Sequence, residues 1–157
     1  MDFTPTLLRG AYFLLGDLSL AEDAVQITML RTSQHWHRAS AAPRAYGRQV
    51  LISVCREHWR RRARRPQEVP VVADVLDLAS ASFTDQVHRR AALDHALGGL
   101  VSPQREVLVL RFFFDLSVEQ TATLLEIAPG TVKSATHRGL RQLREILAPS
   151  DAKELLR

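Results

Sequence analysis

Apolar residues recur at helical spacing along most of the chain, and the pattern stops only over residues 67–84. In the first part, the spacing predicts a short helix over residues 5–16, a longer one over 19–38 and a third over 44–64. The second is expected to begin with Ser19 as its N-cap, because a glutamate three positions later completes a capping box. Three helices of this length predict one compact bundle.

The periodicity also predicts which faces of these helices are buried. In the second helix, the stripe expected to face the core recurs at spacings of four, three and four residues: Val25, Met29, Thr32 and Trp36. A second face lies beside it and consists of Asp23, Gln26, Leu30 and Ser33. In the third helix, the predicted inner face consists of Val50, Leu51, Val54, Cys55 and His58. Its other side consists of Gln49, Ser53, Arg56 and Arg60.

The last part of the chain carries the signals of four further helices. They are predicted at residues 85–97, 103–114, 117–126 and 129–147. Ser102 is the expected N-cap of the second of these, since a proline follows it at the first helical position. Ser117 and Gln120 have the spacing of a capping box at the start of the third. These elements predict a second helical bundle.

The interval between the two bundles has no sustained period and is rich in Val, Ala, Asp and Ser, so we interpret it as an extended acidic linker. The chain is therefore predicted to be all-α, with two small helical bundles joined by that linker. The predicted boundaries are 1–66 for the first domain, 67–84 for the linker, 85–148 for the second domain and 149–157 for a tail.

Composition excludes several classes of protein. The single cysteine, Cys55, rules out an intramolecular disulfide and a thiolate-rich zinc site. No apolar run approaches the roughly 20 residues of a membrane span. The first residues lack the basic flank and apolar stretch of a secretory signal. We therefore expect a cytoplasmic protein that has no contact with a membrane.

The net charge of +4 is unevenly distributed. Residues 1–66 hold eleven basic and five acidic side chains, whereas residues 67–85 hold four acidic and no basic ones. Two basic segments thus flank an acidic connector. This distribution suits a polyanionic partner that is contacted at two places, although solvated helix faces explain the charge alone equally well.

Residues 116–144 carry the strongest local signal, that of a helix-turn-helix. Ala122 is the small residue where the two helices must approach closely, and the predicted apolar wedge consists of Val118, Leu125, Ile127 and Val132. The last helix divides by face. Its predicted inner residues are Val132, Ala135, Leu140, Leu143 and Leu147, and its outer ones are Lys133, Ser134, His137, Arg138, Arg141 and Arg144. Such an outer face suits the phosphates and base edges of duplex DNA.

The sequence contains no motif of a catalytic or metal site. His35 and His37 are two residues apart and face different ways on a helix, while His88 and His95 have no evident carboxylate or thiol partner. We therefore expect no enzyme activity, no cofactor and no metal.

Separate stretches of the chain resemble the extracytoplasmic-function group of sigma-70 RNA polymerase sigma factors. Residues 15–26 contain the run Ala-Glu-Asp-Ala-Val-Gln, and residues 43–62 are similar to the promoter-melting helix of that family. Residues 102–117, followed by 129–134, resemble its C-terminal domain. The resemblance covers about residues 7–147 and is nearest to the actinobacterial sigma-E-type subgroup. It implies a bacterial protein that is associated with the nucleoid when bound to polymerase.

The resemblance also implies a role for individual residues. Those that would dock on the β′ clamp helices of core RNA polymerase are Glu22, Asp23, Gln26, Leu30 and Ser33. Those that would border the melted −10 element are Tyr46, Arg48, Gln49, Ser53, Arg56 and Arg60, and residues 37–43 would capture an extruded base. Those that would read the −35 element are Thr131, Lys133, Ser134, His137, Arg138 and Arg141. The further partners that it implies are promoter DNA, the β flap of polymerase and an anti-sigma factor.

The chain departs from the family pattern at several positions. Ile27 stands where glutamate is usual, and Ser53 stands where asparagine is usual. Ala128 is a poor N-cap where serine is common. The first helix of the N-terminal domain is expected to be shortened, because the resemblance begins close to the first residue.

Alternatives remain for the position of Trp36 and, separately, for the function of the whole chain. Trp36 lies near the arginine-rich helix, but its place on the apolar stripe favours a core residue. The alternative function is a helix-turn-helix regulator with a helical sensor or dimerisation half. Residues 20–62 separate the two functions, since a sensor half needs neither the polar second face nor the arginine-rich helix.

Overall fold

The computed structural model describes residues 3–64 and 84–147, all side chains of 84–88 excepted, and its described residues form helices and connecting turns without a strand. The chain divides into two compact units, Met1–Asp74 and Val75–Arg157. This agrees with the predicted all-α class and the two bundles. The predicted linker, apart from its last residue, and the predicted tail lie outside the described residues.

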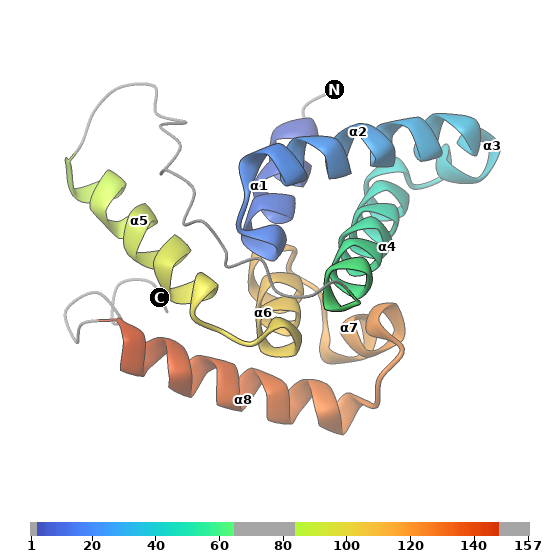
Figure 1. Ribbon diagram of the computed structural model, residues 1–157. Helices are drawn as coiled ribbons and strands as arrows, with labels where there is room; N and C mark the ends of the chain where they lie inside the picture. Colours follow the sequence, from blue (N-terminus) through green and yellow to red (C-terminus); the bar gives the residue numbers. More distant parts are fainter. Residues whose placement is uncertain (1–2, 65–83, 148–157) are drawn as a thin grey trace. The chain divides into compact units, whose positions relative to one another are not determined.

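The first unit is built from α1 (Thr4–Leu15), α2 (Leu18–Gln34), the single turn α3 (Trp36–Ala39) and α4 (Pro43–Ala63). The three long helices pack against one another, as Figure 1 shows. The side chains that fill the space between them include Leu7, Ala11, Leu14, Leu51 and Ile52. A prolyl residue opens α4, where the missing amide hydrogen costs nothing because no helical carbonyl precedes it.

The start and end of α2 differ from the prediction. Asp17, not Ser19, is the N-cap, and its carboxylate accepts a hydrogen bond of 2.9 Å from the amide of Leu20. The prediction failed because both residue types are good caps, and the periodicity does not fix the first turn. The helix ends at Gln34 rather than near Arg38, and the separate turn α3 follows.

The buried face of α2 also differs from the prediction. Val25 is buried, but Met29 and Trp36 are exposed and Thr32 is only half-buried. The stripe that does face the core has the spacing i, i+3, i+4 and i+7 and consists of Ala21, Ala24, Val25 and Thr28. Its small side chains let the neighbouring helices come close, and the Thr28 hydroxyl donates a hydrogen bond of 2.7 Å to the Ala24 carbonyl. The interpretation of Trp36 as a core residue was therefore wrong.

In α4 the predicted inner face is largely confirmed. Leu51, Val54 and Cys55 are buried, and Val50 and His58 are half-buried. The prediction missed Ile52, which is also buried, because it lies at the edge of the predicted stripe. An ion pair of 3.3 Å between Arg31 and Glu57 joins α2 to α4 at the surface.

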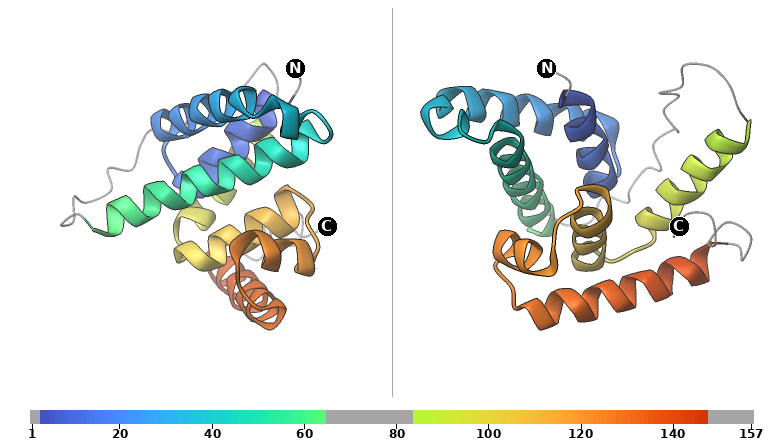
Figure 2. Two further views of the ribbon diagram at one scale, coloured as in Figure 1. Left: turned by 90° about the vertical axis from the view of Figure 1, so that its right-hand side faces the viewer. Right: turned by 180° about the vertical axis from the view of Figure 1, so that it is seen from behind.

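The second unit contains α5 (Thr84–Gly98), α6 (Ser102–Leu108), the π-helical turn η1 (Val109–Phe113), α7 (Val118–Leu125) and α8 (Pro129–Ile146). α8 is the longest of them and packs against α5, α6 and α7 (Figure 2). The core between these helices includes Val107, Leu110, Leu125, Val132 and Leu143.

Two details of the second unit differ from the prediction. Val101 is the N-cap residue of α6, and Ser102 is its first helical residue, with no side-chain capping bond. The predicted continuous helix to residue 114 ends as an α-helix at Leu108, because the Phe114 amide bonds to the Val109 carbonyl at 3.0 Å, which is π-helical spacing. The extra residue of this turn keeps Phe114 buried and leaves Phe112 exposed.

Two close contacts fix the packing of α6. The side chain of Arg105 is buried and donates hydrogen bonds to the carbonyls of Leu97, Gly98 and Leu100, at 2.8, 3.2 and 2.9 Å. These carbonyls include the end of α5, so a positive charge stands where helix-end carbonyls favour one. Gly139 of α8 lies against Leu108, and a Cβ at that position would stand 2.9 Å from Leu108 Cδ1.

Candidate nucleic-acid and protein interfaces

The turn between α7 and α8 gives the helix-turn-helix its geometry. The predicted capping box is present at the start of α7, because Ser117 Oγ accepts from the Gln120 amide at 3.0 Å and Gln120 Oε1 accepts from the Ser117 amide at 2.9 Å. α7 ends at Leu125, and its C-cap Glu126 has φ of 56°, the left-handed conformation that turns the chain toward α8. Ala122 is buried, as predicted.

The inner face of α8 agrees with the prediction. Val132, Ala135, Leu143 and Leu147 are buried, and Leu140 is half-buried. The predicted apolar wedge between α7 and α8 is only partly buried. Leu125 and Val132 are buried, whereas Val118 and Ile127 are half-buried. The N-cap residue Ala128 makes no side-chain capping bond, so α8 begins with Pro129 alone as its start signal.

All six residues predicted to read the −35 element are exposed on α8: Thr131, Lys133, Ser134, His137, Arg138 and Arg141. The Ser134 hydroxyl donates to the Thr131 carbonyl at 3.1 Å, and the Arg138 Nε donates to the Ser134 carbonyl at 3.3 Å. These bonds lay the Arg138 side chain along the helix. The result is a cationic face with short hydroxyl groups between longer basic side chains, which suits the major groove.

The five residues predicted to dock on a protein partner are also exposed, and all lie on α2: Glu22, Asp23, Gln26, Leu30 and Ser33. Ile27 is exposed beside them, so an apolar side chain stands within this set. The Ser33 hydroxyl donates to the Leu30 carbonyl at 2.8 Å. We call this set the α2 face.

The residues predicted to border melted DNA lie along α4, but their exposure differs. Gln49, Ser53 and Arg60 are exposed, whereas Tyr46, Arg48 and Arg56 are half-buried. Burial lowers the pKa of the Arg48 guanidinium from its usual value, because removing a charge from water disfavours it. We call Gln49, Ser53, Arg56 and Arg60 the α4 face.

The C-terminal end of α4 concentrates positive charge around Trp59. Arg60, Arg61 and Arg64 are exposed there, and the Arg62 guanidinium lies 5.7 Å from the centre of the Trp59 ring. Burial is the main cause that lowers the pKa of His58, and the charges of Arg62 and Arg61 lower it further, while Asp17 acts in the opposite direction. The imidazole therefore stays neutral to a lower pH than usual.

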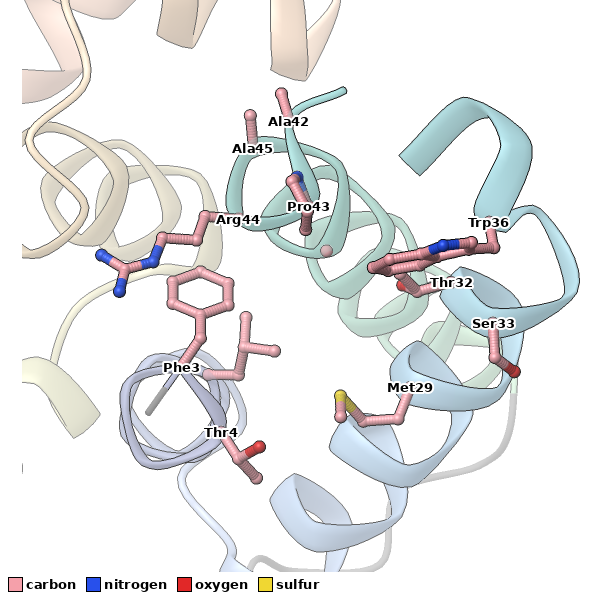
Figure 3. A pocket seen from close by; sticks show the side chains of 12 residues that line it. Phe3, Thr4, Met29, Thr32, Ser33, Trp36, Ala42, Pro43, Arg44 and Ala45 are labelled. Carbon is pink, nitrogen blue, oxygen red and sulfur yellow. The ribbon is translucent and has the colours of Figure 1, made fainter. Parts of the chain in front are cut away.

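A cavity of about 940 Å³ opens between the first turn of α1, the last turns of α2 and the start of α4. Figure 3 shows the ring of Phe3, the thioether of Met29, Pro43 and the indole of Trp36 around one open space. The Thr32 hydroxyl lies beneath the indole and has no hydrogen-bond partner within the described chain. This cavity was not predicted from the sequence, because the apolar stripe on the second helix placed Met29 and Trp36 in the core. The stripe of small residues on α2 is the signal that would have placed them outside it.

The described residues include no cluster of three or more His, Cys, Asp and Glu that would hold a metal ion. None of the described helices has the length and apolar character that crossing a membrane requires.

The family model for region 2 of sigma-70 matches residues 1–65, and the model for region 4 of sigma-70 matches residues 90–143. The chain is 39% identical over 147 residues to the RNA polymerase sigma-E factor of Streptomyces avermitilis, covering 92% of this chain and 80% of that protein. It is 37% identical over 150 residues to the ECF RNA polymerase sigma factor SigL of Mycobacterium tuberculosis, covering 91% and 83%.

Among solved structures, the sigma factor RpoE of Bartonella quintana, crystallised with the anti-sigma factor NepR, matches with a TM-score of 0.66. The two chains are 23% identical, and the match covers 92% of this chain and 91% of the other. This likeness supports the fold alone.

Proposed function

Because this chain belongs to the sigma-70 family, in its extracytoplasmic-function group, we propose that its exposed helix faces divide promoter recognition between the two units. The chain is a sigma factor that directs promoter-specific initiation by RNA polymerase. It acts as an initiation factor rather than a catalyst, in the bacterial cytoplasm and at the nucleoid when bound to polymerase. We assign residues 1–66 and 85–148 to the two functional domains, 67–84 to a linker and 149–157 to a tail.

The outer face of α8 is proposed to anchor the chain on the −35 duplex. The supporting observation is that all six of its predicted residues are exposed while the opposite side of the helix is buried in the core. Lys133, Arg138 and Arg141 would contact phosphates or guanine edges. Ser134 and His137 would make shorter polar contacts between them.

The α2 face is proposed to dock on the clamp helices of the polymerase β′ subunit, and the second unit on the β flap. The acidic groups of Glu22 and Asp23 make the α2 face a poor match for DNA phosphates. A protein partner explains this better, because exposed Leu30 and Ile27 stand beside the same carboxylates.

The α4 face, with Tyr46 and Arg48, is proposed to border the melted −10 element. Its arginines would hold the phosphates of the separated strand, and its Gln49 and Ser53 would contact bases. Residues 37–43, which lead into this helix, would capture the extruded base.

An anti-sigma factor is proposed as a further partner of this chain. The fold neighbour from Bartonella quintana was crystallised with such a protein. A partner of this class would regulate the chain by competing with core polymerase for the α2 face.

A promoter-dependent transcription assay with purified core RNA polymerase tests the proposed function. We expect defined start sites on genomic DNA that depend on the added chain. Binding of duplex DNA without any effect on initiation would favour the alternative function, a helix-turn-helix regulator with a helical sensor half.

A second experiment tests whether the two faces act separately. Asp23→Ala combined with Gln26→Ala should weaken binding to core polymerase and leave −35 duplex binding unchanged. Arg61→Ala combined with Arg64→Ala is the control, because both positions are exposed in the same unit at the C-terminal end of α4, away from α2. Equal core affinity for both double variants would mean that the docking face is misplaced.

A further inference from the structure

Four large hydrophobic side chains of the first unit are exposed in the described chain, and all lie between residues 27 and 36. The exposed fractions are 40% for Ile27, 40% for Met29, 59% for Leu30 and 46% for Trp36. Single exposed apolar residues are ordinary, but a contiguous group usually marks a contact surface. This group, at the last turns of α2 and at α3, therefore indicates a surface that contacts another molecule.

The cavity beside these residues meets the first turns of α4, and none of the four residues of the α4 face lines it. Gly47 lines the cavity, and successive residues of an α-helix are rotated by about 100°. Gln49, Ser53 and Arg56 therefore point roughly opposite to Gly47. DNA that is held by these three side chains therefore contacts another side of α4. It approaches the cavity only at the edge formed by Ala45, one turn before Gln49, and by Pro43, which ends the proposed base-capturing segment.

The cavity shares a lining residue with the α2 face. Ser33 belongs to that face and also lines the cavity, and Met29 lies on the adjoining side of the same helix. Leu30 is exposed between them and the carboxylate of Asp23. A protein that covers the α2 face thus meets the open side of the cavity next.

We propose that the cavity between α1, α2 and α4 is an anchor pocket for core RNA polymerase, which inserts apolar side chains between Phe3, Met29, Pro43 and Trp36. The proposal rests on the proposed function and extends its docking face from polar contacts into a pocket. Large side chains that fill such pockets dominate the affinity of many protein interfaces.

The chemistry of the lining specifies the partner further. Most of the lining is apolar, and its one charged side chain is Arg44, whose guanidinium lies 5.8 Å from the centre of the Phe3 ring at the edge of the pocket. The inserted side chains are therefore apolar, with an acidic group of polymerase next to them at the Arg44 edge.

Two variants test the pocket in the full-length chain. Met29→Trp adds bulk to the open space, and Trp36→Ala removes one of its walls. Ala63→Trp is the control, because it places the same indole on an exposed position of α4, 16 residues from Gly47. The measurement is the affinity of the labelled protein for purified core polymerase, with circular dichroism melting to verify the fold.

Each pocket variant should weaken core binding by about tenfold or more, and Ala63→Trp should stay within about twofold of the wild type. Unchanged affinity in both pocket variants would overturn the pocket while leaving the proposed function intact, provided that Asp23→Ala with Gln26→Ala still weakens binding. If that double variant also binds normally, the proposed docking face itself is wrong. Loss of binding to a single-stranded −10 oligonucleotide in Met29→Trp, with core affinity unchanged, would assign the cavity to DNA and refute the proposal.

Discussion

Gly139 and Gly130 offer the same substitution on the same helix with opposite expected effects. Both lie in α8, and alanine has a higher helix propensity than glycine by about 1 kcal/mol in a helix interior. At Gly130 the added Cβ meets nothing within 4 Å. At Gly139 it would stand 2.9 Å from Leu108 Cδ1, 3.2 Å from Leu108 Cγ and 3.5 Å from Gln104 Cβ.

The magnitudes follow from this difference in space. Gly130→Ala should stabilise the second unit by about 0.4 to 1 kcal/mol, since only the unfolded chain loses freedom. Gly139→Ala gains the same propensity but crowds a buried leucine, and overpacking costs roughly 1 to 3 kcal/mol. The net expectation is a loss of about 1 kcal/mol, which is roughly 4 to 8 °C in the melting temperature of a unit of this size.

The chain supplies its own reporter for this experiment. Its two tryptophans, Trp36 and Trp59, both lie in the first unit, so their fluorescence follows that unit, whereas far-ultraviolet circular dichroism follows both. Gly139→Ala should lower the circular dichroism transition of the second unit and leave the fluorescence transition in place. An increase in stability equal to that of Gly130→Ala would refute the close contact between α6 and α8.

Three further predictions concern single side chains. Arg105→Leu should destabilise the second unit by about 3 kcal/mol in urea unfolding followed by circular dichroism. The substitution leaves the buried carbonyls of Leu97 and Leu100, and the Gly98 carbonyl, whose bond is part-buried, without their charged donor. A loss below about 1 kcal/mol would contradict that role. Lys133→Ala should reduce the salt dependence of −35 duplex binding by about one unit of slope, measured by titration at several salt concentrations, and an unchanged slope would remove Lys133 from the phosphate contacts. The pKa of His58 is lower in the folded chain than in the unfolded one, so the folded state binds fewer protons. The neutral imidazole therefore costs the folded state no stability above the ordinary histidine pKa of about 6.5. The stability of the folded state should fall as the pH decreases through and below this value in tryptophan-fluorescence unfolding, and His58→Gln should flatten the dependence; equal pH profiles would show that another group is responsible.

The sequence predicted the helices and their order well, because amphipathic periodicity and turn residues are local signals. The capping box at Ser117 and the buried face of α8 follow directly from residue types at fixed spacing. The residues predicted to form the α2 face and the outer face of α8 are all exposed in the structure.

The failures came from tertiary packing, which local patterns do not contain. Two stripes on α2 have helical spacing, and the smaller side chains of Ala21 and Ala24 face the core because they let the helices approach closely. Met29 and Trp36 are more hydrophobic but stand at the cavity instead. The π-helical turn Val109–Phe113 was not predicted either, because a one-residue change of hydrogen-bond register does not alter the residue types or their spacing along the chain.

The left-handed residue at the end of α7 has a consequence for the kinetics of DNA binding. The turn is closed by Glu126 rather than by a glycine, so the backbone there has few alternative conformations once the unit is folded. The orientation of α8 relative to α7 is therefore set during folding, and little conformational entropy remains to be lost when the helix enters the major groove. Such a preorganised reader should associate with duplex DNA at a rate limited by electrostatic encounter, with no slow rearrangement after contact.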